Sequence, residues 1–193
     1  MSHYQFAPSP TMGTSEHDFV TWDEGFSHEE IQKIIELGDA IGLQDASVND
    51  YRASQISWIG NTPETAWLYD KLAWITRQLN GQFYQFDLSG FYEDFQYTVY
   101  QSETQGFYDW HLDRGPTETG SPPRKLSLVV QLSDPYEYEG GELQILTSNQ
   151  ARSLVKKRGL IVAFPSFMLH RVTPVTSGIR RSLVVWATGP AFK

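Results

Sequence analysis

The feature that most constrains the fold is a series of short extended segments, separated by turn residues, that follows Gly81. In one of them, 125–132, Leu126, Leu128 and Val130 occupy alternate positions, which is typical of a strand with one apolar face. Short strands at this spacing predict an antiparallel barrel or double sheet. The strands are expected at 83–88, 95–100, 107–111, 125–132, 142–146, 159–164, 169–173 and 181–187. Their number matches a jelly roll, a double-sheet fold of about eight strands.

Two helices are predicted before Gly81. The first begins at Ser27, whose spacing to Glu30 matches a helix capping box. The second has Thr62 as its cap and Pro63 at its first helical position, and it ends at 80–81. Apolar residues recur at the helical period in both: Ile31, Ile34 and Ile35, then Leu68, Leu72, Ile75 and Leu79. Both helices are therefore expected to pack against a sheet.

The domain organisation predicted from these patterns is simple. Residues 1–18 mix proline, glycine, serine and threonine with no apolar period, so they are expected to form an N-terminal arm. Residues 19–193 are expected to form a single domain, because a chain of 193 residues is long enough for one substantial core. Within it, helical support would span 26–81 and the jelly-roll core 83–190. The expected fold class is mainly β with supporting helices, an α+β arrangement.

Composition excludes several classes of partner. The formal net charge of −8 argues against nucleic acid, since binding phosphates requires a basic surface. The chain has no cysteine, so any metal must be held by nitrogen and oxygen ligands. It shows neither an apolar run long enough to span a bilayer nor a basic and apolar leader, so no membrane contact and a cytoplasmic location are expected. The sequence makes no prediction of oligomeric state.

A candidate metal site comes from two histidines and an aspartate. His111 and Asp113 lie two residues apart in a predicted strand, where residues i and i+2 point to the same face. His170 follows the apolar run 160–165. Two histidines with one carboxylate are the ligand set of non-haem Fe(II) sites, which leave coordination positions open. The pair His28 and Glu30 has the same spacing but lies in a predicted helix, where such residues point to nearly opposite sides.

A candidate anion site follows ten residues after His170. A dicarboxylate that chelates a metal through one end leaves its far carboxylate needing a charge partner, and the planar fork of Arg180 meets that need better than a lysine would. Ser182 would point to the same face of the strand and could donate its hydroxyl to the same carboxylate. Arg181 would point away, towards solvent.

These motifs together resemble a known family. The order His111-x-Asp113, His170 and Arg180-x-Ser182 is similar to that of 2-oxoglutarate and Fe(II)-dependent dioxygenases of the prolyl 4-hydroxylase type, including bacterial and phage PKHD-like hydroxylases. The surrounding sequence is similar as well, at Tyr100, Leu126-Ser127, Gly140-Gly141-Glu142-Leu143, 159–164 and Pro165-Ser166-x3-His170-x-Val172-x-Pro174-Val175. The resemblance covers roughly residues 83–190.

The resemblance implies a double-stranded β-helix, or jelly roll, with iron at one end. His111, Asp113 and His170 would be the iron ligands and the catalytic residues, and Arg180 would anchor the 5-carboxylate of 2-oxoglutarate. Tyr100 would donate its phenol to the co-substrate, with Ser182 as a further contact. The implied cofactors are Fe(II), 2-oxoglutarate and O2, and the family also allows ascorbate as a reductant. The implied reaction is hydroxylation of a prolyl or other residue in a peptide or protein.

Two alternatives stay open. One is a non-catalytic jelly roll with a binding or structural role, which an exposed Arg180 or widely separated histidines would favour. The other is an oxygenase that acts on a small molecule. Demethylation of nucleic-acid bases is disfavoured, because that family carries an Arg-x5-Arg pattern that is missing after Arg180.

Two loops are expected to shape the substrate site. Residues 114–123 follow the metal pair directly and would form a lid or rim. Residues 133–141 are acidic and aromatic, with Asp134, Glu137 and Glu139 among them. A basic or proline-bearing peptide would complement this second loop.

Overall fold

The computed structural model describes residues 17–115 and 122–191. The predicted arm, except for its last two residues, and most of the predicted 114–123 lid therefore lie outside the described residues. Within the described residues, no helix has the length and apolar character needed to cross a membrane.

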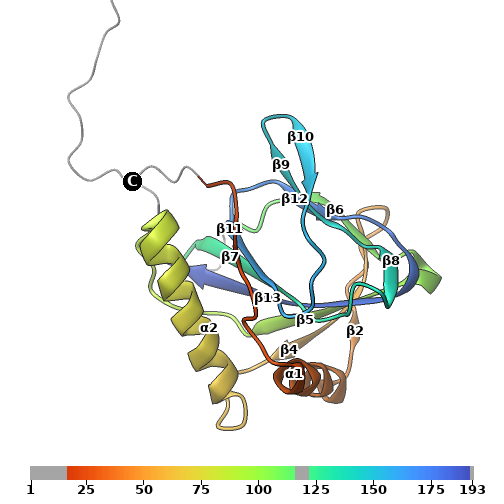
Figure 1. The fold of residues 1–193 in the computed structure, drawn as a ribbon, viewed down its shortest axis with the longest axis horizontal. Coiled ribbons are helices and arrows are strands. Elements are labelled where there is room, and N and C mark those ends of the chain that lie inside the picture. Colours follow the sequence, from red (N-terminus) through yellow and green to blue (C-terminus); the bar gives the residue numbers. More distant parts are fainter. Residues whose placement is uncertain (1–16, 116–121, 192–193) are drawn as a thin grey trace, which may run out of the picture.

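The described chain forms two antiparallel sheets, which face each other across the molecule (Figure 1). The larger sheet has the order β1 (Val20–Trp22), β11 (Ile161–Pro165), β7 (Arg124–Gln131), β13 (Val175–Thr188), β5 (Phe95–Gln101), β4 (Gln55–Ile59) and β2 (Gln44–Asp45), and β8 (Tyr138–Gly140) also pairs with β13. The smaller sheet has the order β10 (Gln150–Ser153), β9 (Leu143–Thr147), β12 (His170–Val172), β6 (Phe107–His111) and β3 (Arg52–Ala53). The mainly β architecture predicted from the sequence is confirmed.

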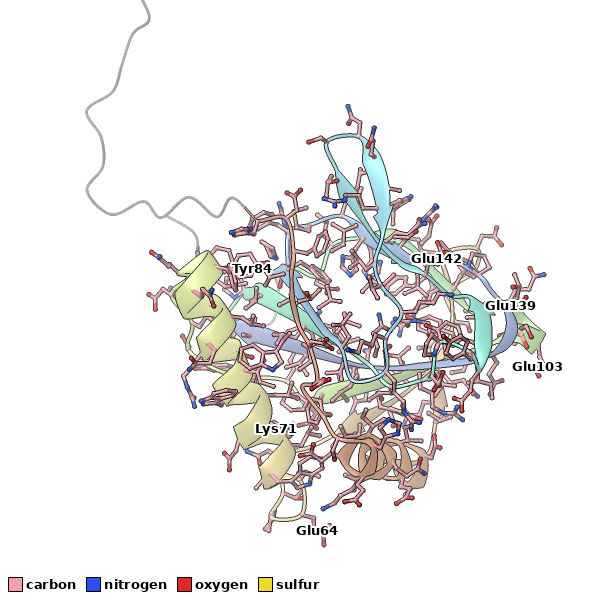
Figure 2. All side chains as sticks on the ribbon, in the orientation of Figure 1. Glu64, Lys71, Tyr84, Glu103, Glu139 and Glu142 are labelled. Atoms are coloured by element: carbon pink, nitrogen blue, oxygen red, sulfur yellow. The ribbon has the colours of Figure 1, made fainter. Side chains whose placement is uncertain are left out.

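Two helices, α1 (His28–Ile41) and α2 (Ala66–Leu79), pack on the larger sheet (Figure 1). The predicted capping box is present, with Ser27 Oγ 3.2 Å from the amide of Glu30 and Glu30 Oε2 2.7 Å from the amide of Ser27. Lys71 of α2 (Figure 2) pairs with Glu30 of α1 at 2.7 Å. The buried helical residues Ile34, Leu68 and Leu72 share one core with the sheet, and burial of each such side chain contributes about 1.5–3 kcal/mol.

The second helix differs from its prediction at both ends. It begins at Ala66, because Thr65 Oγ1 accepts from the Thr62 amide and donates to the Gly60 carbonyl in a turn that precedes the helix. At the other end the chain does not stop at Gly81 but continues as a π-helical turn, Asn80–Tyr84.

The strand predicted at 83–88 is wrong. Tyr84 (Figure 2) is buried in the core, where its hydroxyl donates to the Ala163 carbonyl at 2.9 Å. Asn80 bonds both the amide and the carbonyl of Phe86, at 2.9 and 2.8 Å, and so closes a reversal in place of a strand. These long-range and turn contacts override the local β preference of the aromatic residues.

The region 26–81, predicted to be helical support, also contains the strands β2, β3 and β4. The first two are only two residues long, too short for any alternation to be visible in the sequence. β3 pairs with β6, Arg52 lying opposite Tyr108, so a residue from the N-terminal half reaches the smaller sheet. β13 is also longer than predicted, since its first residues pair with β8.

Sheet order sets which residues meet in the interior. In the smaller sheet His170 of β12 lies opposite His111 of β6. In the larger sheet β13 runs between β5 and β7, so that Arg180 lies opposite Tyr100 and Ser182 opposite Gln131. Residues far apart in the chain are thereby brought to one cavity between the sheets.

Candidate metal centre and anion site

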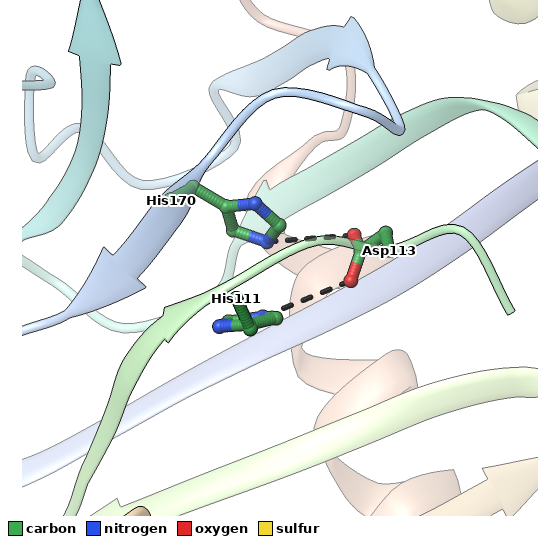
Figure 3. Close-up of side chains that lie close together, drawn as sticks. All are labelled: His111, Asp113 and His170. Carbon is green, nitrogen blue, oxygen red and sulfur yellow. Dashed lines mark ion pairs between the residues drawn. The ribbon is translucent and has the colours of Figure 1, made fainter.

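The three predicted ligands converge (Figure 3). One ligand atom from each of His111, Asp113 and His170 lies within 4.8 Å of the others. His111 Nε2 is 3.7 Å from Asp113 Oδ1, and His170 Nε2 is 3.5 Å from Asp113 Oδ2. β6 ends at His111, so Asp113 is positioned not by strand pairing but by its amide, which donates to the Ser166 carbonyl at 2.9 Å.

Both histidines present the same ring nitrogen to the centre. His111 Nδ1 lies 2.7 Å from the Asp109 carbonyl, and His170 Nδ1 lies 2.9 Å from the Met168 carbonyl. A carbonyl oxygen can only accept, so each Nδ1 carries a proton and Nε2 is the ring nitrogen left to bind a metal. Such a second contact orients a histidine for metal binding. The two Nε2 atoms are those that face Asp113.

The charge states also suit a cation. Burial and the neighbouring His170 lower the pKa of His111 to about 4, so this ring is neutral at neutral pH. Burial acts to raise the pKa of Asp113, but the two imidazoles, with hydrogen bonds from Trp186 and Ser127, hold it below its ordinary value. The centre therefore combines a carboxylate with a neutral imidazole lone pair, both of which are ligands for a divalent ion.

Arg180 is a buried cation that pairs with no carboxylate among the described residues. Its side chain is 1% exposed, and its Nη1 and Nη2 atoms each lie 3.2 Å from a neutral oxygen, Ser182 Oγ and Gln131 Oε1. Within the described ranges no carboxylate forms an ion pair with it, and its Nε is buried without a hydrogen-bond partner. A buried charge without an opposite charge is costly, so this environment fits an anionic ligand.

The remaining predicted residues join the same cavity. Tyr100 is 4% exposed, and its ring centre lies 5.3 Å from the guanidinium carbon of Arg180. Ser182 contacts Arg180 directly. All six predicted site residues therefore line one cavity: Tyr100, His111, Asp113, His170, Arg180 and Ser182. Trp186 lines it too.

Arg181 differs from its prediction. It points to the opposite face from Arg180, but it is partly buried instead of solvent-facing, and it interacts with the Tyr97 hydroxyl. That hydroxyl donates to Asp39 of α1 at 2.9 Å. Arg181 therefore belongs to the packing of α1 against the larger sheet.

Two residues that contact Arg180 escape the sequence reasoning. Gln131 faces Arg180 from β7, on the strand face that it shares with Ser127 and Val129, and the sequence does not signal this contact. Tyr138 of β8 is buried and its hydroxyl interacts with Arg180, a contact that the sequence does not signal. The nearby Gly141 has φ 57°, and a Cβ there would lie 3.0 Å from Arg180 Cδ, so glycine leaves room for the arginine.

Comparison with known proteins agrees with this geometry. Residues 95–188, which contain all six predicted site residues, match the model of the 2OG-Fe(II) oxygenase superfamily. A PKHD-type hydroxylase of Synechococcus sp. (strain CC9311) is 37% identical over 91 residues, which cover 47% of this chain and 40% of the relative. A PKHD-type hydroxylase of Prochlorococcus marinus is 46% identical over 79 residues, or 41% and 35% of the two chains. The chain thus matches less than half the length of these relatives.

Solved structures share the fold. A Pseudomonas putida prolyl-4-hydroxylase superposes with a TM-score of 0.73 at 22% identity, covering 91% of this chain and 95% of that one. A viral collagen prolyl hydroxylase from Paramecium Bursaria Chlorella virus-1, solved as a 2OG complex, gives 0.69 at 21% identity, with coverages of 90% and 97%. The predicted double-stranded β-helix, or jelly roll, is thereby confirmed.

Proposed function

We propose that this chain is a member of the 2OG-Fe(II) oxygenase superfamily, a hydroxylase that uses Fe(II), 2-oxoglutarate and O2. The observation that carries the proposal is the pairing of two sites in one cavity. One is the His-Asp-His cluster, and the other is Arg180, a buried cation that pairs with no carboxylate in the described part of the chain. The proposed unit is a single domain over 19–193, and the proposed location is the cytoplasm.

The donor set fits the metal that the superfamily uses. His111 and His170 would bind through Nε2 and Asp113 through a carboxylate oxygen, which leaves the other coordination positions open. When bound, Fe(II) supplies the redox chemistry that couples oxidative decarboxylation of 2-oxoglutarate to hydroxylation of a C–H bond. The protein's own part is to hold the two imidazoles in the ligating tautomer and to keep the carboxylate ionised.

The co-substrate would bind between the metal ligands and Arg180. The guanidinium would donate two parallel hydrogen bonds to the far carboxylate of 2-oxoglutarate. Ser182 and Gln131 hold the guanidinium in place, and Tyr100 lies against it. Apolar side chains line the same cavity and would keep water from the reacting groups: Val129, Leu143, Val172 and Val184.

For the substrate we propose a prolyl or other residue in a peptide or protein. The support is the similarity to proteins named prolyl-4-hydroxylase and PKHD-type hydroxylase. The acidic 133–141 loop supports a basic or proline-bearing peptide, since Glu137 and Glu139 are exposed there and Tyr136 is 97% exposed. An exposed Arg180 or widely separated histidines would favour a non-catalytic jelly roll. Arg180 is buried and the two histidines lie close together, so this alternative is disfavoured.

Anaerobic titration of Fe(II) into the apoprotein with 2-oxoglutarate tests the proposal. The expected result is a metal-to-ligand charge-transfer band in the visible region for the wild type, and no band for His170→Ala. No band in the wild type would refute the iron and co-substrate site. Where the band forms, coupled succinate release with peptides, with and without ascorbate, is expected. Release with small molecules but no peptide would replace the peptide substrate by the small-molecule alternative.

A further inference from the structure

Two buried serine hydroxyls form a chain that ends on the Asp113 carboxylate. Ser127 Oγ lies 2.8 Å from Asp113 Oδ2, and Ser166 Oγ lies 2.9 Å from Ser127 Oγ. Both serines are 0% exposed. A hydroxyl has a single proton to donate, and Ser127 directs its proton to the carboxylate, so Ser166 must donate to Ser127. The direction of the chain is therefore Ser166 to Ser127 to Asp113.

Ser127 occupies an apolar position in the sheet. It lies on β7 between Leu126 and Leu128, with Phe164 opposite on β11 and Trp186 opposite on β13. Burying a hydroxyl there without a hydrogen bond would cost free energy. The serine is thus not explained by packing, but it is explained by the carboxylate that its hydroxyl reaches.

Ser166 also restrains Asp113 through backbone hydrogen bonds. Its carbonyl accepts from the Asp113 amide at 2.9 Å, and its own amide donates to the Lys125 carbonyl at 3.0 Å. Because β6 has already ended at His111, no strand pairing restrains Asp113. The turn after β11 therefore takes the place of a strand in fixing its backbone.

The remaining freedom of Asp113 is rotation of its carboxylate. This torsion has a broad energy profile, so a staggered rotamer does not fix the plane of the group. A hydrogen bond to one carboxylate oxygen fixes that plane. With Oδ2 held by Ser127, Oδ1 stays directed to the side of His111 Nε2, 3.7 Å away.

We propose that Ser127 and Ser166 are positioning residues that orient the Asp113 carboxylate for metal binding. The inference rests on the proposed function, since it takes the His-Asp-His cluster to be a metal site. Loss of a hydrogen-bond partner behind a ligand typically weakens metal affinity by about 10- to 100-fold, and we expect this loss for Ser127→Ala. Ser166→Ala leaves the bond from Ser127 to Asp113 in place, so we expect a smaller loss of about threefold from weaker support of the chain.

The test measures Mn(II) binding to the full apoprotein, without 2-oxoglutarate, from the electron paramagnetic resonance signal of free Mn(II). Ser57→Ala is the matched control: Ser57 is 2% exposed, and its hydroxyl donates to the Gly38 carbonyl at 2.7 Å, under α1. All three variants lose a buried, hydrogen-bonded hydroxyl, so thermal unfolding of the apoproteins reports any shared loss of stability. Only the Ser127 and Ser166 variants are expected to lose Mn(II) affinity.

The outcomes separate this inference from the proposed function. If the wild type does not bind Mn(II), the metal site itself is refuted and the inference falls with it. If the wild type binds and Ser127→Ala binds equally well, or if Ser57→Ala weakens binding as much, the positioning role alone is refuted. Should Ser127→Ala fail to fold, the Mn(II) affinity of Ser166→Ala is the test. A Ser166→Ala affinity equal to that of the wild type would refute the role of the serine pair.

Discussion

Replacing Arg180 by methionine should weaken the binding of 2-oxoglutarate while changing the free energy of unfolding of the apoprotein only a little. Arg180 is 1% exposed and is held by neutral groups, Ser182 and Gln131, at 3.2 Å. Removing one member of a fully formed buried ion pair costs about 3–5 kcal/mol, because the other charge is left buried. Here no carboxylate among the described residues would be left behind. The loss in free energy of unfolding of the apoprotein should therefore be smaller than for a broken ion pair.

Two opposing terms set the size of this stability change. Arg180→Met relieves the desolvation of a buried cation, worth several kcal/mol. It also leaves Gln131 Oε1 and Ser182 Oγ without their donor, at about 1–3 kcal/mol each. These terms are of similar magnitude, so the free energy of unfolding should change by less than about 2 kcal/mol. Binding of 2-oxoglutarate should suffer far more, since truncating a buried charge pair costs about 2–5 kcal/mol, or about 30- to 5,000-fold in affinity.

The assay is calorimetric titration of 2-oxoglutarate into the Mn(II)-loaded protein, with urea unfolding of the apoprotein in parallel. Arg181→Met is the matched control, because Arg181 is the next residue on β13 but interacts with Tyr97 on the opposite face. It should change stability and leave 2-oxoglutarate affinity intact. Wild-type affinity in Arg180→Met, or a loss of stability of the full 3–5 kcal/mol size, would refute the reasoning. The second result would mean that Arg180 already has a charge partner.

Two further predictions concern pH and backbone conformation. The free energy of unfolding of the apoprotein should fall as pH is lowered from 6.5 to about 4, because the unfolded chain binds a proton that the buried His111 excludes. In His111→Gln, urea unfolding across this window should show a flatter pH dependence, and an unchanged slope would exclude His111 as its source. Gly141→Ala should lose both stability and 2-oxoglutarate affinity, since its Cβ would lie 2.8 Å from Val175 Cγ2 and 3.0 Å from Arg180 Cδ at φ 57°. Gly42→Ala, at φ 94° with no atom within 4 Å, has backbone strain alone and should keep its affinity; equal losses in both variants would contradict the steric argument.

Local patterns in the sequence predicted the elements that depend on local chemistry. The capping box at Ser27 forms as predicted, because its partners are three residues apart. The strand 107–111 has its predicted bounds. The strand at 83–88 fails because the contacts of Tyr84 and Asn80 outweigh the local β preference, and no local pattern reports those contacts. The two-residue strands β2 and β3 are too short to show a period.

The sequence by itself determined which groups are available for the site: two imidazoles, one carboxylate and one guanidinium, at spacings that a β fold can bring together. It also determined the mainly β class, since alternation along a strand is a local property. The tertiary structure decided how those groups are supported. Gln131 and Tyr138 meet Arg180, and Ser127 and Ser166 meet Asp113, only because β7, β8 and β11 lie where the sheet order places them. Hydrogen bonds between distant residues depend on sheet order and register, which arise from packing of the whole chain and not from any short stretch of it.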